Sequence, residues 1–141
     1  MCNGLLWNEL SSKEKDDILK VRTVKFGDVL ARRRSDLQMS QSDISQKLGY
    51  VRGSIVSAFE NGRLRPASEK VREIAAIYQF DETRFYAVYI YLFHPDIWYM
   101  FSKMSVPCLS NNMLEHVEVF FFGGCDKICA TEIYKFVIIQ R

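Results

Sequence analysis

The sequence lacks the features that would mark a membrane-spanning or secreted protein. Its longest apolar run, Phe85–Phe93, is far shorter than the roughly 20 residues that cross a bilayer. Residues 1–10 contain no basic segment followed by an apolar core, so they predict no secretory signal. We therefore expect a cytoplasmic protein with no membrane partner.

Catalytic motifs are also missing. There is no glycine-rich phosphate loop, no nucleophile elbow and no His-x-x-x-His pair, and the two histidines lie far apart in the sequence. These absences predict that the protein is not an enzyme. Its function is then expected to lie in binding.

The few cysteines follow no standard zinc spacing. They are Cys2, Cys108, Cys125 and Cys129. In a cytoplasmic chain such scattered cysteines are typical of free thiols, so we expect no metal and no other cofactor. Two alternatives stay open: a zinc site formed by the last three cysteines with His116, and thiols that respond to oxidation.

Net charge is small but unevenly placed. Apolar residues make up 48% and charged residues 26% of the 141 residues, which favours one folded domain, alone or with an appendage, over a disordered chain. The net charge is +2, yet residues 24–80 hold ten basic and six acidic side chains. This balance of +4 favours either an anionic partner such as nucleic acid or simply a solvated basic face.

Apolar spacing and capping signals predict five helices within residues 24–93, after a short charged helix from Ser12 to about Val21. The five expected helices are Lys25–Ser35; a helix opened by the capping box of Ser40 and Asp43 and ending near Gly49; Arg52–Asn61; a helix after Pro66 with Ser68 as its cap; and a helix capped by Asp81 that ends at His94, before Pro95.

Residues 94–141 carry weaker signals. Val117–Phe122 and Tyr134–Ile139 are rich in strand formers, with Gly123-Gly124 as a turn between them, and slightly favour strands. Residues 85–101 contain eight of the nineteen aromatic residues, which we interpret as anchors of a homodimer interface. An ordinary core and a pocket for a small apolar effector are the alternatives.

Two short helices joined by a tight turn, the second with a polar outer face, have the geometry of a helix-turn-helix. Residues 39–49 (MSQSDISQKLG) and 59–66 (FENGRLRP) resemble the Cro/C1-type (XRE-like) helix-turn-helix regulators of phage and bacteria. The resemblance covers about residues 24–90. It implies a mainly α chain with a five-helix, lambda-repressor-like domain at 24–93. A helical extension (1–23) would precede this domain, and a dimerisation region (94–141) would follow it. If that last region forms strands, the fold class is α+β instead.

The resemblance also implies roles for single residues. Gln41 matches the family glutamine that contacts a DNA phosphate and braces the recognition helix, whereas Arg34 and Glu60 match an ion pair that we expect to be architectural. Arg52 is the main candidate for reading a base edge, and basic residues after the helix suit phosphate contacts. The expected DNA-binding residues are Ser40, Gln41, Arg52, Gly53, Ser54, Ser57, Asn61, Arg63 and Arg65. The alternative for Ser40 and Gln41 is that they only cap a helix. The alternative for Arg63 and Arg65 is that they are solvated loop residues without a DNA contact.

One departure from the family pattern concerns spacing. Between Gly49 and Glu60 this chain has one residue more than the pattern. Either the turn at residues 50–51 is longer or the helix has a bulge near residues 55–56. We expect the longer turn, because the apolar positions of the helix keep their spacing relative to Glu60.

These observations predict a sequence-specific regulator of transcription that binds double-stranded DNA, acting as a homodimeric repressor on a palindromic operator. The alternative is an antitoxin-like interaction protein, whose hydrophobic C-terminal tail neutralises a partner protein and whose DNA binding only regulates its own operon. A third hypothesis is a switch that responds to a ligand or to oxidation through residues 95–141.

Overall fold

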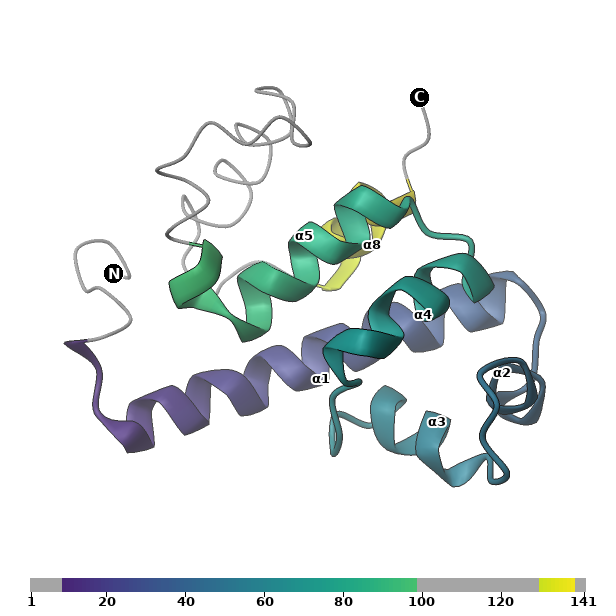
Figure 1. The fold of residues 1–141 in the computed structure, drawn as a ribbon, viewed down its shortest axis with the longest axis horizontal. Helices are drawn as coiled ribbons and strands as arrows, with labels where there is room; N and C mark the ends of the chain where they lie inside the picture. Colours follow the sequence, from purple (N-terminus) through teal and green to yellow (C-terminus); the bar gives the residue numbers. More distant parts are fainter. Residues whose placement is uncertain (1–8, 99–129, 139–141) are drawn as a thin grey trace.

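The computed structural model describes residues 9–98 and 130–138, and every regular element within these ranges is helical. Residues 95–98 form one more helical turn after the fifth α-helix. The elements are α1 (Ser12–Asp36), α2 (Gln41–Lys47), α3 (Ser54–Glu60), the 3-10 turn η2 (Ser68–Lys70), α4 (Val71–Ile77), α5 (Glu82–Phe93) and α8 (Ala130–Ile138) (Figure 1). The mainly α class and the five helices expected in residues 24–93 are confirmed.

α1 is one helix of 25 residues, not the two shorter helices that we predicted. Ser11 opens it with a capping box to Glu14, as the sequence indicates. The expected break near residue 23 does not occur: the Thr23 hydroxyl donates to the Leu19 carbonyl at 2.6 Å inside the helix. Arg22 is buried and donates to two backbone carbonyls at the end of α5, which holds this part of α1 in place. The predicted boundary at 23/24 therefore falls within a helix.

The helix that follows Pro66 begins later than predicted. α4 starts at Val71, after the single turn η2, and Ser68 does not cap it. Asp81 does cap α5, since its carboxylate accepts the Arg84 backbone N–H at 2.9 Å. α5 then ends at Phe93, two residues before Pro95.

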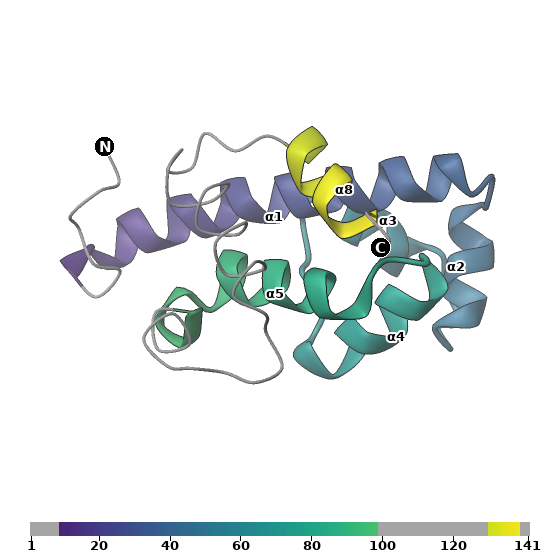
Figure 2. The same ribbon diagram turned by 90° about the horizontal axis from the view of Figure 1, so that it is seen from above.

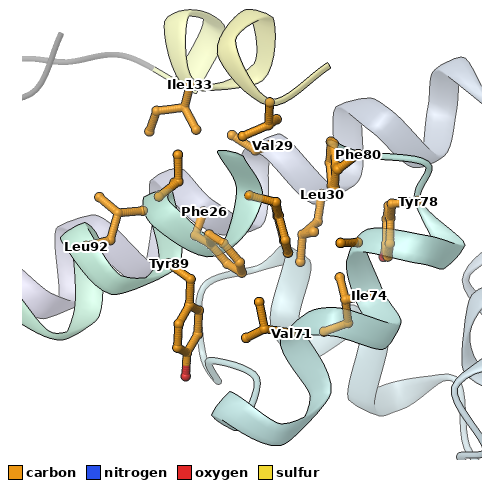
Figure 3. Close-up of a cluster of buried hydrophobic side chains, with 14 of the residues drawn as sticks. Phe26, Val29, Leu30, Val71, Ile74, Tyr78, Phe80, Tyr89, Leu92 and Ile133 are labelled. Atoms are coloured by element: carbon orange, nitrogen blue, oxygen red, sulfur yellow. The ribbon is translucent and has the colours of Figure 1, made fainter. Parts of the chain in front are cut away.

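The strand predicted at Tyr134–Ile139 is wrong, because residues 130–138 form the helix α8. Ile133, Phe136 and Val137 are buried at i, i+3 and i+4, so the helix gathers the apolar residues on one face. That face packs on α1 and α5 and joins their core (Figures 2 and 3). The other predicted strand, Val117–Phe122, and Gly123-Gly124 lie outside the described residues.

The aromatic residues described within residues 85–98 lie mostly in the core, so for these residues the assignment to a dimer interface is wrong. Five of them are at most 6% exposed: Phe85, Tyr89, Tyr91, Phe93 and Trp98. The Phe26 ring from α1 stacks on Phe85 with 5.3 Å between ring centroids, and Phe80 stacks on the same ring at 4.6 Å. Tyr86 is half-buried, and Tyr99 and Phe101 lie outside the described residues.

α1 lies between two groups of helices. α3 packs on one side of it and α5 with α8 on the other, and α2 follows at its C-terminal end (Figure 1). The first turns of α1 project beyond the other described helices in both views (Figure 2). Within the described ranges, no helix combines the length and the apolar character that a membrane span needs.

Candidate nucleic-acid interface

α2 begins at a complete capping box. The Ser40 hydroxyl accepts the Asp43 backbone N–H at 3.0 Å, and the Asp43 carboxylate accepts the Ser40 backbone N–H at 2.9 Å. These bonds lower the pKa of Asp43, with the backbone N–H of Ser40 as the main cause. Ser40 is therefore a structural cap, and it is exposed at the start of α2.

The turn between α2 and α3 contains the additional residue. Gly49 has φ +82°, a conformation that favours glycine, and the Tyr50 N–H donates to the Ser45 carbonyl at 2.9 Å. α3 starts at Ser54, two residues later than predicted, and its first bond joins the Ser57 N–H to the Gly53 carbonyl at 3.1 Å. A longer turn, with no bulge in the helix, accommodates the spacing.

α3 separates an inner from an outer side. Val56 and Phe59 are buried, whereas Ser54 and Asn61 are exposed. The Asn61 amide donates to the Ser57 hydroxyl at 3.2 Å, so these two polar groups lie side by side one turn apart. The outer side of α3 thus presents small polar groups.

A buried carboxylate joins three helices. Arg34 of α1 donates to both oxygens of Glu60 in α3, at 2.7 and 3.0 Å, and also to the Met39 carbonyl at 2.9 Å. Gln41 of α2 donates its amide to Glu60 Oε1 at 3.1 Å. The hydrogen bond to Glu60 raises the pKa of Arg34. The expected architectural pair and the bracing role of Gln41 are therefore present in the structure.

Glycine allows α1 and α3 to approach closely. A Cβ at Gly27 would collide with the Phe59 carbonyl oxygen and lie 2.6 Å from that of Glu60. After α3, Gly62 has φ +73°, and a Cβ there would lie 2.7 Å from Val24. Both contacts involve backbone atoms, so α1 and α3 can approach each other this closely only with glycine at these positions.

Three of the predicted arginines are exposed near α3. Arg52 precedes the helix, and Arg63 and Arg65 follow it. The Arg65 guanidinium lies 5.4 Å from the centroid of the Phe93 ring, a cation–π distance that holds it against α5. Other basic residues of the central segment have structural contacts instead: Arg32, Arg33, Arg34, Lys70 and Arg72.

The start of α3 lies beside the start of α2. A Cβ at Gly53 would be 3.6 Å from the Ser42 hydroxyl oxygen, an ordinary van der Waals contact. Gly53 and Ser54 are therefore close to the predicted residues Ser40 and Gln41. The structure brings the nine predicted residues to α2, α3 and the segments that flank α3.

Two residues that fix the turn were missed by sequence reasoning. The buried Ser45 donates its hydroxyl to the Arg52 carbonyl at 3.2 Å. The Lys70 ammonium lies 3.3 Å from the Leu48 carbonyl oxygen and 5.4 Å from the centroid of the Tyr50 ring. Neither contact has a local sequence signal, since Lys70 is 22 residues from Leu48.

The metal alternative proposed for the cysteines is not tested by the described ranges. No group of three or more His, Cys, Asp or Glu residues there is placed to hold a metal ion. The four cysteines and His116 lie outside these ranges, so the thiol hypotheses stay predictions.

Comparison with known proteins identifies the central segment. No curated protein and no solved structure matches the chain. Residues 25–85 match the model of a family described as a helix-turn-helix domain, and the matched segment runs from α1 into α5. Residues 25–85 are therefore similar to helix-turn-helix domains, a family associated with the Cro/C1-type (XRE-like) DNA-binding regulators.

Proposed function

We propose that the protein is a sequence-specific regulator of transcription that binds double-stranded DNA and is not an enzyme. The supporting observation is the outer side of α3, which presents exposed polar groups while Val56 and Phe59 fix its inner side in the core. An α-helix fits the width of the DNA major groove, where each base pair presents its own pattern of donors and acceptors.

The proposed contacts fall into two classes. Arg52 has a fork of donors that matches guanine O6 and N7, and Ser54, Ser57 and Asn61 offer shorter polar groups to neighbouring bases. Arg63 and Arg65 suit phosphates, which orient the protein without reading sequence. Ser40, Gln41 and Gly53 lie at the starts of α2 and α3, where we propose that the DNA backbone approaches them.

We further propose that the protein is a homodimeric repressor acting by occupation of its operator. One recognition helix reads only a few base pairs, whereas two related by a two-fold axis read a palindrome with half-sites ~34 Å apart. The buried aromatics of α5 do not supply the interface. The dimer proposal rests on this argument from symmetry.

The test is selection of bound duplexes from a random DNA pool with the full chain, at fixed near-physiological salt because phosphate contacts make affinity salt-dependent. A palindromic motif with half-sites one helical turn apart supports both sequence reading and the dimer. A motif without symmetry supports sequence reading and contradicts the dimer. If no motif emerges, specific DNA reading is wrong, and the search moves to a protein partner of residues 85–141, as the antitoxin-like alternative predicts.

A further inference from the structure

Val51 is the most exposed of the large apolar side chains in the described residues. It is 99% exposed, whereas the next four, Val21, Val24, Leu64 and Ile97, are between 42% and 49% exposed. It lies in the turn between α2 and α3, directly before Arg52. Because no neighbour covers its side chain, Val51 contributes no hydrophobic stabilisation to the free protein.

The turn that carries Val51 is fixed on both sides. Before it, the centroid of the Tyr50 ring lies 6.3 Å from that of the Phe59 ring, and the Lys70 ammonium lies 5.4 Å from the Tyr50 centroid. After it, the Arg52 carbonyl accepts the Ser45 hydroxyl at 3.2 Å. Because both neighbours are held, Val51 projects from an ordered backbone.

The additional residue of the turn accounts for this projection. Tyr50 is half-buried and packs inward, and the chain still reaches the start of α3, so one side chain is left without a place in the core. Gly53, two residues on, lies beside Ser42 of α2. Two extended residues span at most ~7 Å, so Val51 is close to where α2 and α3 begin together.

The chemistry of the major groove supplies one apolar target. The thymine C5-methyl group is the apolar feature on the base edges there, and apolar side chains recognise it. Valine has a β-branched side chain with restricted χ1, so its methyl groups are presented in a defined direction. Resting on the proposed DNA-binding function, we propose that Val51 contacts a thymine methyl group next to the base read by Arg52 and so determines specificity at that position.

The test combines a protein change with the removal of one methyl group from the DNA. Each thymine of the selected operator is replaced in turn by deoxyuridine, and the Kd is measured for the wild type and for Val51→Ala. At one thymine the wild type should lose about fourfold in affinity, the equivalent of one buried methyl group, and Val51→Ala should lose nothing there. Ile97→Ala, which shortens another exposed apolar side chain far along the chain, should keep the wild-type response.

The outcomes separate this assignment from the proposed function. If Val51→Ala retains the full wild-type loss at every thymine, or if the wild type shows none, the assignment is wrong while specific DNA binding stands, and the exposure of Val51 then points to a protein contact. If the chain selects no DNA sequence, the proposed function and the assignment are both overturned. Because Val51 packs on nothing, a folding defect in Val51→Ala is not expected, and thermal unfolding checks this.

Discussion

Arg52 and Arg63 carry the same charge but flank opposite ends of α3, and we expect different defects when they are removed. Arg52→Ala should lower the discrimination between operator and random DNA by roughly 1–3 kcal/mol, since a bidentate contact to a base is lost. Arg63→Ala should weaken binding to both DNAs alike and flatten the salt dependence by about one unit. Fluorescence anisotropy on both duplexes over a range of salt measures each effect.

The two variants act as controls for each other, because both side chains are exposed and neither change disturbs the core. Equal losses of Arg52→Ala on operator and random DNA would remove Arg52 from the base-reading role. A loss of Arg63→Ala confined to the operator would likewise contradict its assignment to phosphate.

Two buried tyrosines differ in whether the hydroxyl group has a hydrogen-bond partner. Removing the hydroxyl should therefore change the stability of the protein differently at the two positions. The Tyr89 hydroxyl donates to the Pro66 carbonyl at 2.7 Å, whereas the Tyr78 hydroxyl has no hydrogen-bond partner in the described part of the chain. Tyr89→Phe should lower the free energy of unfolding by about 1–2 kcal/mol. Tyr78→Phe should leave it unchanged or raise it, as urea unfolding at neutral pH would show. A substantial loss for Tyr78→Phe would mean that its hydroxyl is satisfied.

The same tyrosines predict how stability changes in alkali. Burial raises the pKa of Tyr78, and it is also the main cause of the raised pKa values of Tyr89 and Tyr134. Because the tyrosine pKa is raised in the folded state, the unfolded chain loses its phenolic protons first as the pH rises. Stability is therefore retained below the ordinary tyrosine pKa near 10 and falls as the pH rises from there through the raised pKa values of the folded state. Tyr78→Phe should therefore make the decline above about pH 10 shallower than in the wild type.

At the scale of elements, the packing of α1 on α3 depends on Gly27. In an exposed helix interior, Gly→Ala stabilises by up to about 1 kcal/mol. At Gly27 the added Cβ meets the Phe59 and Glu60 carbonyls, so Gly27→Ala should instead destabilise the protein by about 2 kcal/mol. Gly53→Ala, where the nearest atom is 3.6 Å away and the backbone is helical, is the control and should change stability by less than about 0.5 kcal/mol. A stabilised Gly27→Ala variant would show that α1 and α3 separate without cost.

α8 contributes to the same core as the helix-turn-helix domain. Ile133 is fully buried in it, while Lys135 on the opposite side of the helix is exposed. Ile133→Ala should therefore cost about 3 kcal/mol of unfolding free energy, and Lys135→Ala almost nothing. The comparison is made by chemical denaturation followed by circular dichroism. Equal midpoints for Ile133→Ala and the wild type would mean that α8 does not stay docked on α1 and α5.

The elements that the sequence predicted well are those with local signals. The Ser40–Asp43 capping box and the Asp81 cap are contacts over three residues, and the structure contains both. The continuity of α1 and the helical state of α8 depend on distant partners: Arg22 bonds to carbonyls 69 and 70 residues away, and the Asp81 N–H donates to the Val137 carbonyl at 2.8 Å. Such tertiary contacts override intrinsic propensity, so no local pattern reveals them.

The candidate site shows the same division. The Arg34–Glu60 pair and the bracing by Gln41 followed from the family resemblance, and the structure contains these contacts. The burial of the aromatics of residues 85–98 did not follow, because the composition of a segment does not reveal which other segments cover it. The roles of Ser45 and Lys70, which fix the turn, were not predicted either. Their partners are backbone carbonyls in that turn, and the sequence does not show which side chain reaches them.

At the scale of the whole molecule, the +4 balance of residues 24–80 overstates the charge that is free to meet DNA. At least half of the ten basic side chains in that segment contact backbone, hydroxyl or carboxylate groups, among them Arg33 at the end of α4 and Arg34 at Glu60. The three proposed DNA-binding arginines, Arg52, Arg63 and Arg65, lie on either side of α3. The number of arginines that meet phosphates therefore sets an upper limit on the salt dependence of binding.

This limit makes salt dependence a test of stoichiometry. Each phosphate neutralised on duplex DNA contributes about −0.9 to the slope of log K against log salt, so one copy that uses Arg63 and Arg65 gives about −2 and two copies give about −4. We expect the smaller slope on a duplex with a single half-site and the larger slope on the full palindrome, measured by anisotropy between low and moderate salt. The double variant Arg63→Ala, Arg65→Ala should bring both slopes toward zero. The same slope on both duplexes would mean that one copy binds the palindrome, which contradicts the homodimer even if specific binding stands.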